Sequence, residues 1–128
     1  MATLQHPTAV RNTIADTVVD LVDAGSAAGE LKFFTSNGGS LLATLTFSDP
    51  AFGAAAGGAA AANAITDDTN VTAGTVAWFE VQDSNGTTVF EGDVTSDDVG
   101  TGSIQLSSVA LGSGDTVSVS SLTYTAPN

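Results

Sequence analysis

The chain has 128 residues, of which fourteen are acidic and only two, Arg11 and Lys32, are basic, so its formal net charge is −12. Two cations cannot neutralise a row of phosphates, which argues against direct binding to nucleic acid or to an anionic lipid surface. The absence of cysteine excludes disulfides and thiolate chemistry. The length is typical of one domain, and we expect a single folded unit over residues 8–128 after a flexible arm over residues 1–7.

Residues 8–24 have the apolar spacing of one amphipathic helix. Thr8 is the expected N-cap, Pro7 precedes it, and Gly25 follows the last apolar turn. The apolar stripe comprises Val10, Ile14, Val18, Leu21 and Val22, and the polar residues of the opposite face are Arg11, Asn12, Asp16, Asp20 and Asp23. Asp20 and Asp23 oppose the helix dipole, so we expect packing of the apolar stripe to stabilise the helix.

Beyond Glu30 the periodicity changes to the two-residue alternation of strands. Residues 31–35 and 41–47 predict a hairpin around the Asn–Gly and Gly–Gly pairs of the 36–40 turn. Residues 74–82 and 87–91 predict a second hairpin of the same design. The face of the 41–47 strand that we expect to point inward consists of Leu41, Ala43, Leu45 and Phe47.

Residues 51–64 form an alanine- and glycine-rich stretch in which Phe52 is the only large side chain. Each glycine would cost about 1 kcal/mol in a helix interior, so we expect an extended or irregular segment. Further strands are expected over residues 103–107 and 116–119, with a β-bulge near residues 120–121 and a last strand that ends at residues 126–127. The whole pattern predicts a mainly β fold: an antiparallel β-sandwich or jelly-roll-like domain with one N-terminal amphipathic helix, which covers one face or reaches a neighbouring molecule.

Few side chains have the pattern of a reactive site. His6 is the only imidazole, and it lies beside Pro7 without a partner at catalytic or metal-ligand spacing. Glu80 and Glu91 can face each other across the second hairpin, as a glycosidase pair does, but this aromatic-poor chain offers little from which to build a sugar pocket. Trp78 is better interpreted as a core residue or an interface anchor. We therefore expect no enzyme and no cofactor.

Acidic pairs in the predicted loops are the remaining candidates. Asp67–Asp68 and Asp97–Asp98, with Asp93 nearby, offer oxygen ligands of the kind that Ca²⁺ prefers. Neither stretch fits the EF-hand pattern or an aspartate–glycine repeat, so we favour solvated acidic loops over a metal site.

Three stretches carry a resemblance to a known class of proteins. They read ATLTFSDPAFGAAA over residues 43–56, AWFEVQDSNGTTVF over 77–90 and SLTYTAP over 121–127. In amino-acid composition and in short sequence segments they resemble small virion structural proteins of tailed bacteriophages and prophages. The resemblance implies a non-enzymatic structural role, with capsid decoration (a cement protein that stabilises the head from outside) as the first choice. The alternatives are a carbohydrate- or receptor-binding β-sandwich module of a fibre or spike, and another tail or head-completion protein.

This hypothesis predicts partners and a location. The partners would be the major capsid protein or other virion proteins, together with further copies of the chain, preferably as a trimer. Strong acidity suits the head exterior rather than a surface against packaged DNA, and the N-terminus does not resemble a signal peptide, so synthesis in the host cytoplasm is expected. The predicted contact residues are His6 and Pro7 of the arm, Asp49 and Pro50, and Phe52 as a buried anchor.

Overall fold

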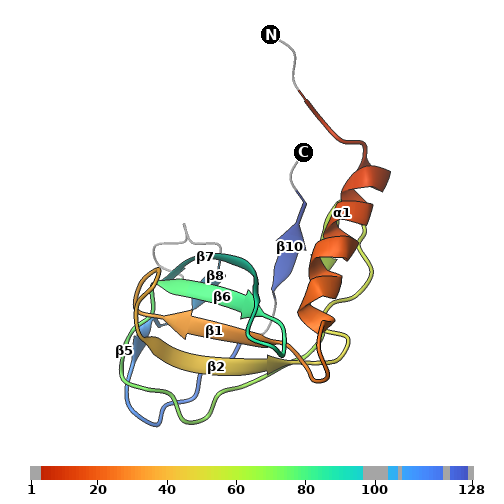
Figure 1. Cartoon of the computed structure of the whole chain (residues 1–128). Helices are drawn as coiled ribbons and strands as arrows, with labels where there is room; N and C mark the ends of the chain where they lie inside the picture. The colour runs from red at the N-terminus through yellow and green to blue at the C-terminus, as the bar shows by residue number, and fades with distance from the viewer. Residues whose placement is uncertain (1–3, 97–103, 107, 120–121, 127–128) are drawn as a thin grey trace.

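The fold is mainly β with one N-terminal helix, as the periodicity predicts. The structure is a computed structural model that describes residues 4–96, 104–106, 108–119 and 122–126 (Figure 1). Helix α1 (Thr8–Asp20) continues into the 3₁₀ turn η1 (Leu21–Asp23). The strands are β1 (Glu30–Phe34), β2 (Leu41–Phe47), β3 (Ala59–Ala61), β4 (Ile65–Thr66), β5 (Gly74–Thr75), β6 (Trp78–Gln82), β7 (Thr88–Ser96), β8 (Ile104–Leu106), β9 (Ala110–Leu111) and β10 (Thr123–Thr125).

Both predicted hairpins are present, and they lie side by side in one sheet of order β4-β2-β1-β6-β7-β8. Strand β1 pairs antiparallel with β2 on one side and with β6 on the other, so the hairpins meet through β1 and β6. Strand β8 pairs parallel with β7, which corrects the expectation of a wholly antiparallel sheet. The sequence between β7 and β8 has no Asn–Gly pair of the kind that reverses a chain into a tight hairpin.

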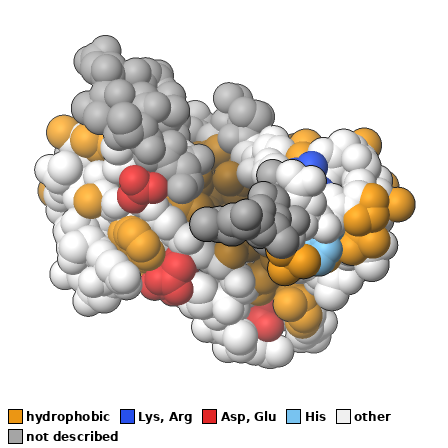
Figure 2. Space-filling view, turned by 90° about the horizontal axis from the view of Figure 1, so that it is seen from above, with side chains coloured by type: hydrophobic (Ala, Val, Ile, Leu, Met, Phe, Trp, Pro, Cys, Tyr) orange, Lys and Arg blue, Asp and Glu red, His pale blue; other side chains and the backbone are white. Residues whose placement is uncertain are grey.

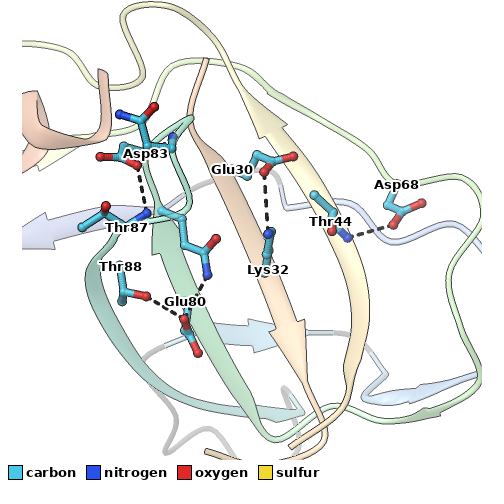
Figure 3. Close-up of polar contacts among 10 residues, drawn as sticks. Glu30, Lys32, Thr44, Asp68, Glu80, Asp83, Thr87 and Thr88 are labelled. Carbon is cyan, nitrogen blue, oxygen red and sulfur yellow. Dashed lines mark hydrogen bonds and ion pairs between the residues drawn. The ribbon is translucent and has the colours of Figure 1, made fainter. Parts of the chain in front are cut away.

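The two faces of this sheet differ in polarity. Leu31, Phe33 and Phe79 point inward and are buried, whereas their neighbours along the strands point outward. On the outward face the Lys32 ammonium lies 3.8 Å from a carboxylate oxygen of Glu30 (Figure 3). Alternation of this kind is what a sheet with one buried face requires.

A β-bulge changes which residues of β2 point inward. Phe33 pairs with Ala43 but Phe34 pairs with Leu41, so Leu42 is the extra residue of β2. Leu42 is buried, and Leu41 is 44% exposed. The prediction that Leu41 points inward is therefore wrong, whereas the other three residues of that predicted face are buried.

Short strand pairs and their connecting segments cover the inward face of the sheet, which gives a sandwich-like arrangement. Strand β3 pairs with β10, and β5 pairs with β9. The side chains that these segments bury in the common core include Val71, Val76, Val117, Val119 and Leu122. Aromatic rings cross this core: the ring centroid of Phe52 lies 5.6 Å from that of Phe47 and 6.4 Å from that of Phe90. Tyr124 lies 5.1 Å from Phe90 between ring centroids.

Two predicted strands differ from the observed ones. The 74–82 strand is divided, because β5 pairs with β9 while β6 pairs with β1 and β7. Residues 116–119 form only an isolated bridge, between Val117 and Asp68. Val119 and Leu122 are both buried, as the predicted shift of parity requires, although the expected bulge at residues 120–121 lies outside the described residues.

The alanine- and glycine-rich segment is irregular, as predicted. Apart from β3 it forms isolated bridges, one of which joins Ala56 to Ala59. Gly57 and Gly58 make the turn between them with φ values of +62° and +82°. Glycine adopts this left-handed region far more readily than other residues, so the turn explains why the alanine run is interrupted there.

Helix α1 stands at one end of the sheet, across the direction of the strands, and contacts β3 and β10 (Figure 1). It therefore does not cover a face of the large sheet. The predicted helix over residues 8–24 is confirmed to within one residue when the 3₁₀ turn is included. The cap is different, because Pro7 is the N-cap residue, no side chain caps the helix, and Thr8 is its first residue.

Candidate interaction surfaces

Helix α1 is rotated relative to the prediction, so that another face packs inward. The buried residues of the helical segment are Ala15, Val19 and Val22. Val10 and Leu21, which belong to the predicted inward stripe, are 41% and 53% exposed. Ala15, Val19 and Val22 also have helical spacing, but the small Ala15 side chain makes this stripe less apolar than the one that contains Ile14, Val18 and Leu21.

Polar side chains beside this buried face explain the rotation. Three of them accept backbone N–H groups from the alanine- and glycine-rich segment: Asn12 Oδ1 from Gly58 at 2.7 Å, Asp16 Oδ1 from Ala55 at 2.7 Å, and Asp23 Oδ1 from Ala51 at 2.8 Å. The Arg11 guanidinium donates to the Ala126 carbonyl at 3.1 Å. An irregular segment has no neighbouring strand to satisfy these N–H groups, so the helix side chains supply the acceptors. The predicted polar outer face of the helix is therefore mostly internal, and only Asp20 of its five residues is exposed.

The opposite side of α1 faces solvent. We call it the outer stripe of α1, and it consists of Val10, Thr13, Ile14, Thr17 and Leu21. At 3.6 residues per turn these positions span an arc of about 100°, centred away from Ala15 and Val19. Ile14 is half-buried and packs against the edge of the core, and the other four residues are exposed. None of the five side chains carries a charge, although the chain as a whole has a net charge of −12.

The two hydroxyl groups of the outer stripe are already paired. Thr13 donates to the Ala9 carbonyl at 3.2 Å, and Thr17 donates to the Thr13 carbonyl at 2.8 Å. A threonine bonded to its own helix in this way presents no free donor to a partner. Water can therefore be removed from this stripe without leaving a hydroxyl donor unsatisfied.

The structure separates the predicted contact residues and corrects one of them. His6 is half-buried and Pro7 is exposed just before α1, and residues 4–7 lead away from the body (Figure 1). Asp49 and Pro50 are exposed near the other end of the helical segment, where the Asp23 carboxylate accepts the N–H of the residue after Pro50. Phe52 is only 6% exposed and packs in the core of its own chain. Phe52 is therefore unavailable as an anchor for a partner.

Trp78 and Tyr124 do not share a groove. Trp78 lies on the outward face of the sheet, half-buried, and its indole N–H donates to Glu91 at 3.2 Å. Tyr124 packs against Phe90 on the inward side. A carbohydrate-binding module would present exposed aromatic rings together in one groove, and these two residues lie on opposite sides of the sheet.

Because Trp78 is only half-buried, Trp78→Ala should lower the free energy of unfolding by about 1–2 kcal/mol. Phe79→Ala, at the adjacent buried position, should lower it by about 3–5 kcal/mol. Urea denaturation of both variants measures the difference. Equal losses would contradict the assignment of Trp78 to the outward face.

The two glutamates considered as a catalytic pair lie on the open face of the sheet. Glu80 and Glu91 are cross-strand partners in β6 and β7. Glu80 accepts hydrogen bonds from Thr88 at 2.7 Å and from Gln82 at 3.0 Å (Figure 3), and Glu91 accepts the indole N–H described above. Their hydrogen bonds hold both carboxylates within the polar network of this face.

A cavity of about 350 Å³ lies elsewhere, and it is lined by Leu106, Ser108, Ala110, Leu111, Asp115, Thr116, Val117 and Ser118. Its one ionisable side chain, Asp115, accepts the Gly112 N–H at 2.7 Å. The serine and threonine hydroxyls of the lining have no histidine or lysine beside them among these residues. Among these described residues, the hydroxyl groups therefore have no imidazole or amine base in the lining.

The acidic pair Asp67–Asp68 is divided between two roles. Asp68 accepts the N–H of Thr44 at 2.8 Å and that of Asn70 at 2.9 Å, which fixes the chain beside the edge of β2 (Figure 3). Asp67 is exposed. Within the described ranges, no three His, Asp or Glu side chains are grouped as a metal ion would require, and Asp97–Asp98 lies outside those ranges.

No protein-family model matches the chain, and no curated protein sequence or solved structure is significantly similar to it. In the part of the chain that the structure describes, no helix combines the length and apolarity needed to cross a bilayer.

Proposed function

We propose that the protein is a non-enzymatic structural component of a tailed-phage virion, and that it decorates the outside of the head. The outer stripe of α1 carries the proposal. It is an uncharged surface on a strongly acidic chain: Val10, Thr13, Thr17 and Leu21 are exposed, while Ile14 packs partly against the core. Surfaces of this kind on soluble domains are typically used for contacts with other proteins.

Two further observations support an assembly role. Residues 4–7, ahead of α1, extend away from the body (Figure 1), and the Leu4 side chain is 84% exposed. The described cavity offers a single carboxylate, already bonded to backbone, where hydrolytic chemistry would need an activated nucleophile. Together with the resemblance of three sequence stretches to small virion proteins, these features favour attachment over catalysis.

The position of the polypeptide in a purified particle tests the proposal. Mass spectrometry with stoichiometry should find many copies per particle, and a density map should place them on the outer surface of the head. Location in the tail tube, the portal or the capsid interior would contradict decoration.

Reconstitution supplies a matched comparison. Added to heads that lack this chain, Leu4→Asp protein should bind at least tenfold more weakly than the unmodified protein, since a charge replaces the exposed apolar side chain of the arm. Leu41→Asp introduces the same charge at an exposed leucine of β2 and should bind normally. Equal binding by the two variants would show that the arm does not take part in the contact with the head.

A further inference from the structure

The same tripeptide, Ser–Asn–Gly, forms part of the turn in both hairpins. It occupies residues 36–38 between β1 and β2 and residues 84–86 between β6 and β7. The asparagine and the glycine are exposed in both turns, and none of the described residues crowds either glycine. Both glycines have a positive φ, +80° at Gly38 and +85° at Gly86. The two turns are therefore matched in local sequence, in exposure and in glycine conformation.

The hydrogen bond that closes each turn falls on a different residue relative to this tripeptide. Between β1 and β2 the Gly39 N–H donates to the Ser36 carbonyl at 2.9 Å, so the Asn–Gly pair lies at the centre of the turn. Between β6 and β7 the Gly86 N–H itself donates to the Asp83 carbonyl at 3.1 Å. Among the described residues, the Gly38 N–H has no hydrogen-bond acceptor. The N–H that follows the asparagine is therefore bonded in the second turn and open to water in the first.

A buried carboxylate adds a second difference between the turns. Asp83 Oδ1 accepts the backbone N–H groups of Asn85 and Thr87 (Figure 3), each at 2.9 Å. These two N–H groups flank that of Gly86, so the carboxylate places negative charge beside it, and negative charge disfavours the loss of a nearby proton. In the first turn the side-chain acceptor is a neutral hydroxyl oxygen, that of Thr35.

We propose that Asn37 is a site of spontaneous deamidation through a succinimide, whereas the fold protects Asn85 from the same reaction. Hydroxide removes the proton of the Gly38 N–H, and the nitrogen attacks Cγ of Asn37. The N–Cγ bond forms, the Cγ–Nδ2 bond breaks, and the amide nitrogen leaves as ammonia after it takes a proton from water. A second water opens the ring at either carbonyl, which gives an aspartyl or an isoaspartyl residue. An N–H held in a hydrogen bond loses its proton more slowly, as it does in hydrogen exchange.

Deamidation would change the β1–β2 turn in two ways. It replaces a neutral amide by a carboxylate, which adds one negative charge to the formal net charge of −12. The isoaspartyl product also adds one carbon atom to the backbone of the turn, beside the pairing of Phe34 with Leu41. Charged residues make up only 12% of the chain, and the acidic side chains seen in Figure 2 lie apart from one another. One further carboxylate is therefore a change that anion-exchange chromatography can resolve. This inference is independent of the proposed function.

Incubation of the purified full chain at mildly alkaline pH tests the proposal, with mass spectrometry of the two turn peptides after cleavage at aromatic residues. In the folded chain Asn37 should convert roughly tenfold faster than Asn85, or more, because only its neighbouring N–H is open to water. In urea that unfolds the chain the two rates should become similar, since the tripeptides are identical. The isoaspartyl product identifies the succinimide route, because direct hydrolysis of the amide gives aspartate alone. No conversion at Asn37, equal rates in the folded chain, or faster conversion at Asn85 would each overturn the proposal.

Two variants separate the site from its protection. Asn37→Ser should abolish the acidic species that forms first on anion exchange, and persistence of that species would place the modification elsewhere. Asp83→Ala removes the acceptor of the Asn85 and Thr87 N–H groups, so conversion at Asn85 should rise several-fold while conversion at Asn37 stays the same. Circular dichroism and thermal melting establish that this variant is folded during the incubation. Unchanged conversion at Asn85 in the folded variant would overturn this account of the protection, and the comparison within the unmodified chain does not depend on either variant.

Discussion

Phe52→Ala is expected to lower the free energy of unfolding by about 3–5 kcal/mol and the melting temperature by roughly 10 °C or more. The ring is almost fully buried and lies between Phe47 and Phe90, with centroid separations of 5.6 Å and 6.4 Å. Removing it would leave a cavity at the point where the irregular segment joins the core of the sheet. Neighbouring atoms can collapse into such a cavity only in part, which is why the loss exceeds the transfer free energy of the ring.

Urea denaturation with far-UV circular dichroism measures this loss, and Phe52→Leu is the graded control. Leucine keeps most of the apolar volume, so its loss should stay below about 1.5 kcal/mol. At temperatures where the alanine variant remains folded, its attachment to heads should be normal, because the ring does not reach the surface. A loss of attachment with stability changed by less than about 1 kcal/mol would instead restore Phe52 as a contact residue.

Local signals predicted the hairpins, while the orientation of α1 depended on distant residues. The Asn–Gly turns act within a few residues of the strands that they join, so β1–β2 and β6–β7 could be predicted from the sequence. The face of α1 that packs inward depends on N–H groups of a segment that follows much later, since Asp16 bonds to a residue 39 positions away. An aspartate on a helix can accept hydrogen bonds from water or from a backbone N–H group. Its position in the sequence does not show which of the two it meets.

The candidate surfaces also depend partly on local residues and partly on distant ones. The sequence identified Phe52 as the one large side chain of an alanine-rich stretch, but an aromatic ring fills a core as well as it fills an interface. Leu42 points inward because of a bulge in the pairing of β1 with β2. No residue of the neighbouring turn predicts that bulge from the sequence. Which residues form the outer stripe of α1 depends on the hydrogen bonds of Asn12, Asp16 and Asp23, which orient the opposite face of the helix toward the irregular segment.

Asp16→Ala is expected to lower the free energy of unfolding by about 1–3 kcal/mol, whereas Asp20→Ala should change it by no more than about 0.5 kcal/mol. Both residues are acidic and lie one turn apart on α1. Asp16 accepts the Ala55 N–H at 2.7 Å in a partly buried position, while Asp20 is exposed. Alanine at position 16 would leave that N–H without its acceptor, and the irregular segment has no strand partner there to replace it.

Asp16→Asn separates the hydrogen bond from the charge. The amide retains an oxygen at the same place, so this variant should keep most of the stability that Asp16→Ala loses. Asp20→Ala should be neutral or slightly stabilising, since it removes a negative charge near the C-terminal end of the helix dipole. Urea denaturation gives the free energies, and amide hydrogen exchange at Ala55 reports the local effect, which should accelerate in Asp16→Ala and remain unchanged in Asp20→Ala. Equal losses in the two alanine variants would show that Asp16 does not hold the irregular segment, and the contact of α1 with that segment would then rest on Asn12, Asp23 and the buried apolar residues.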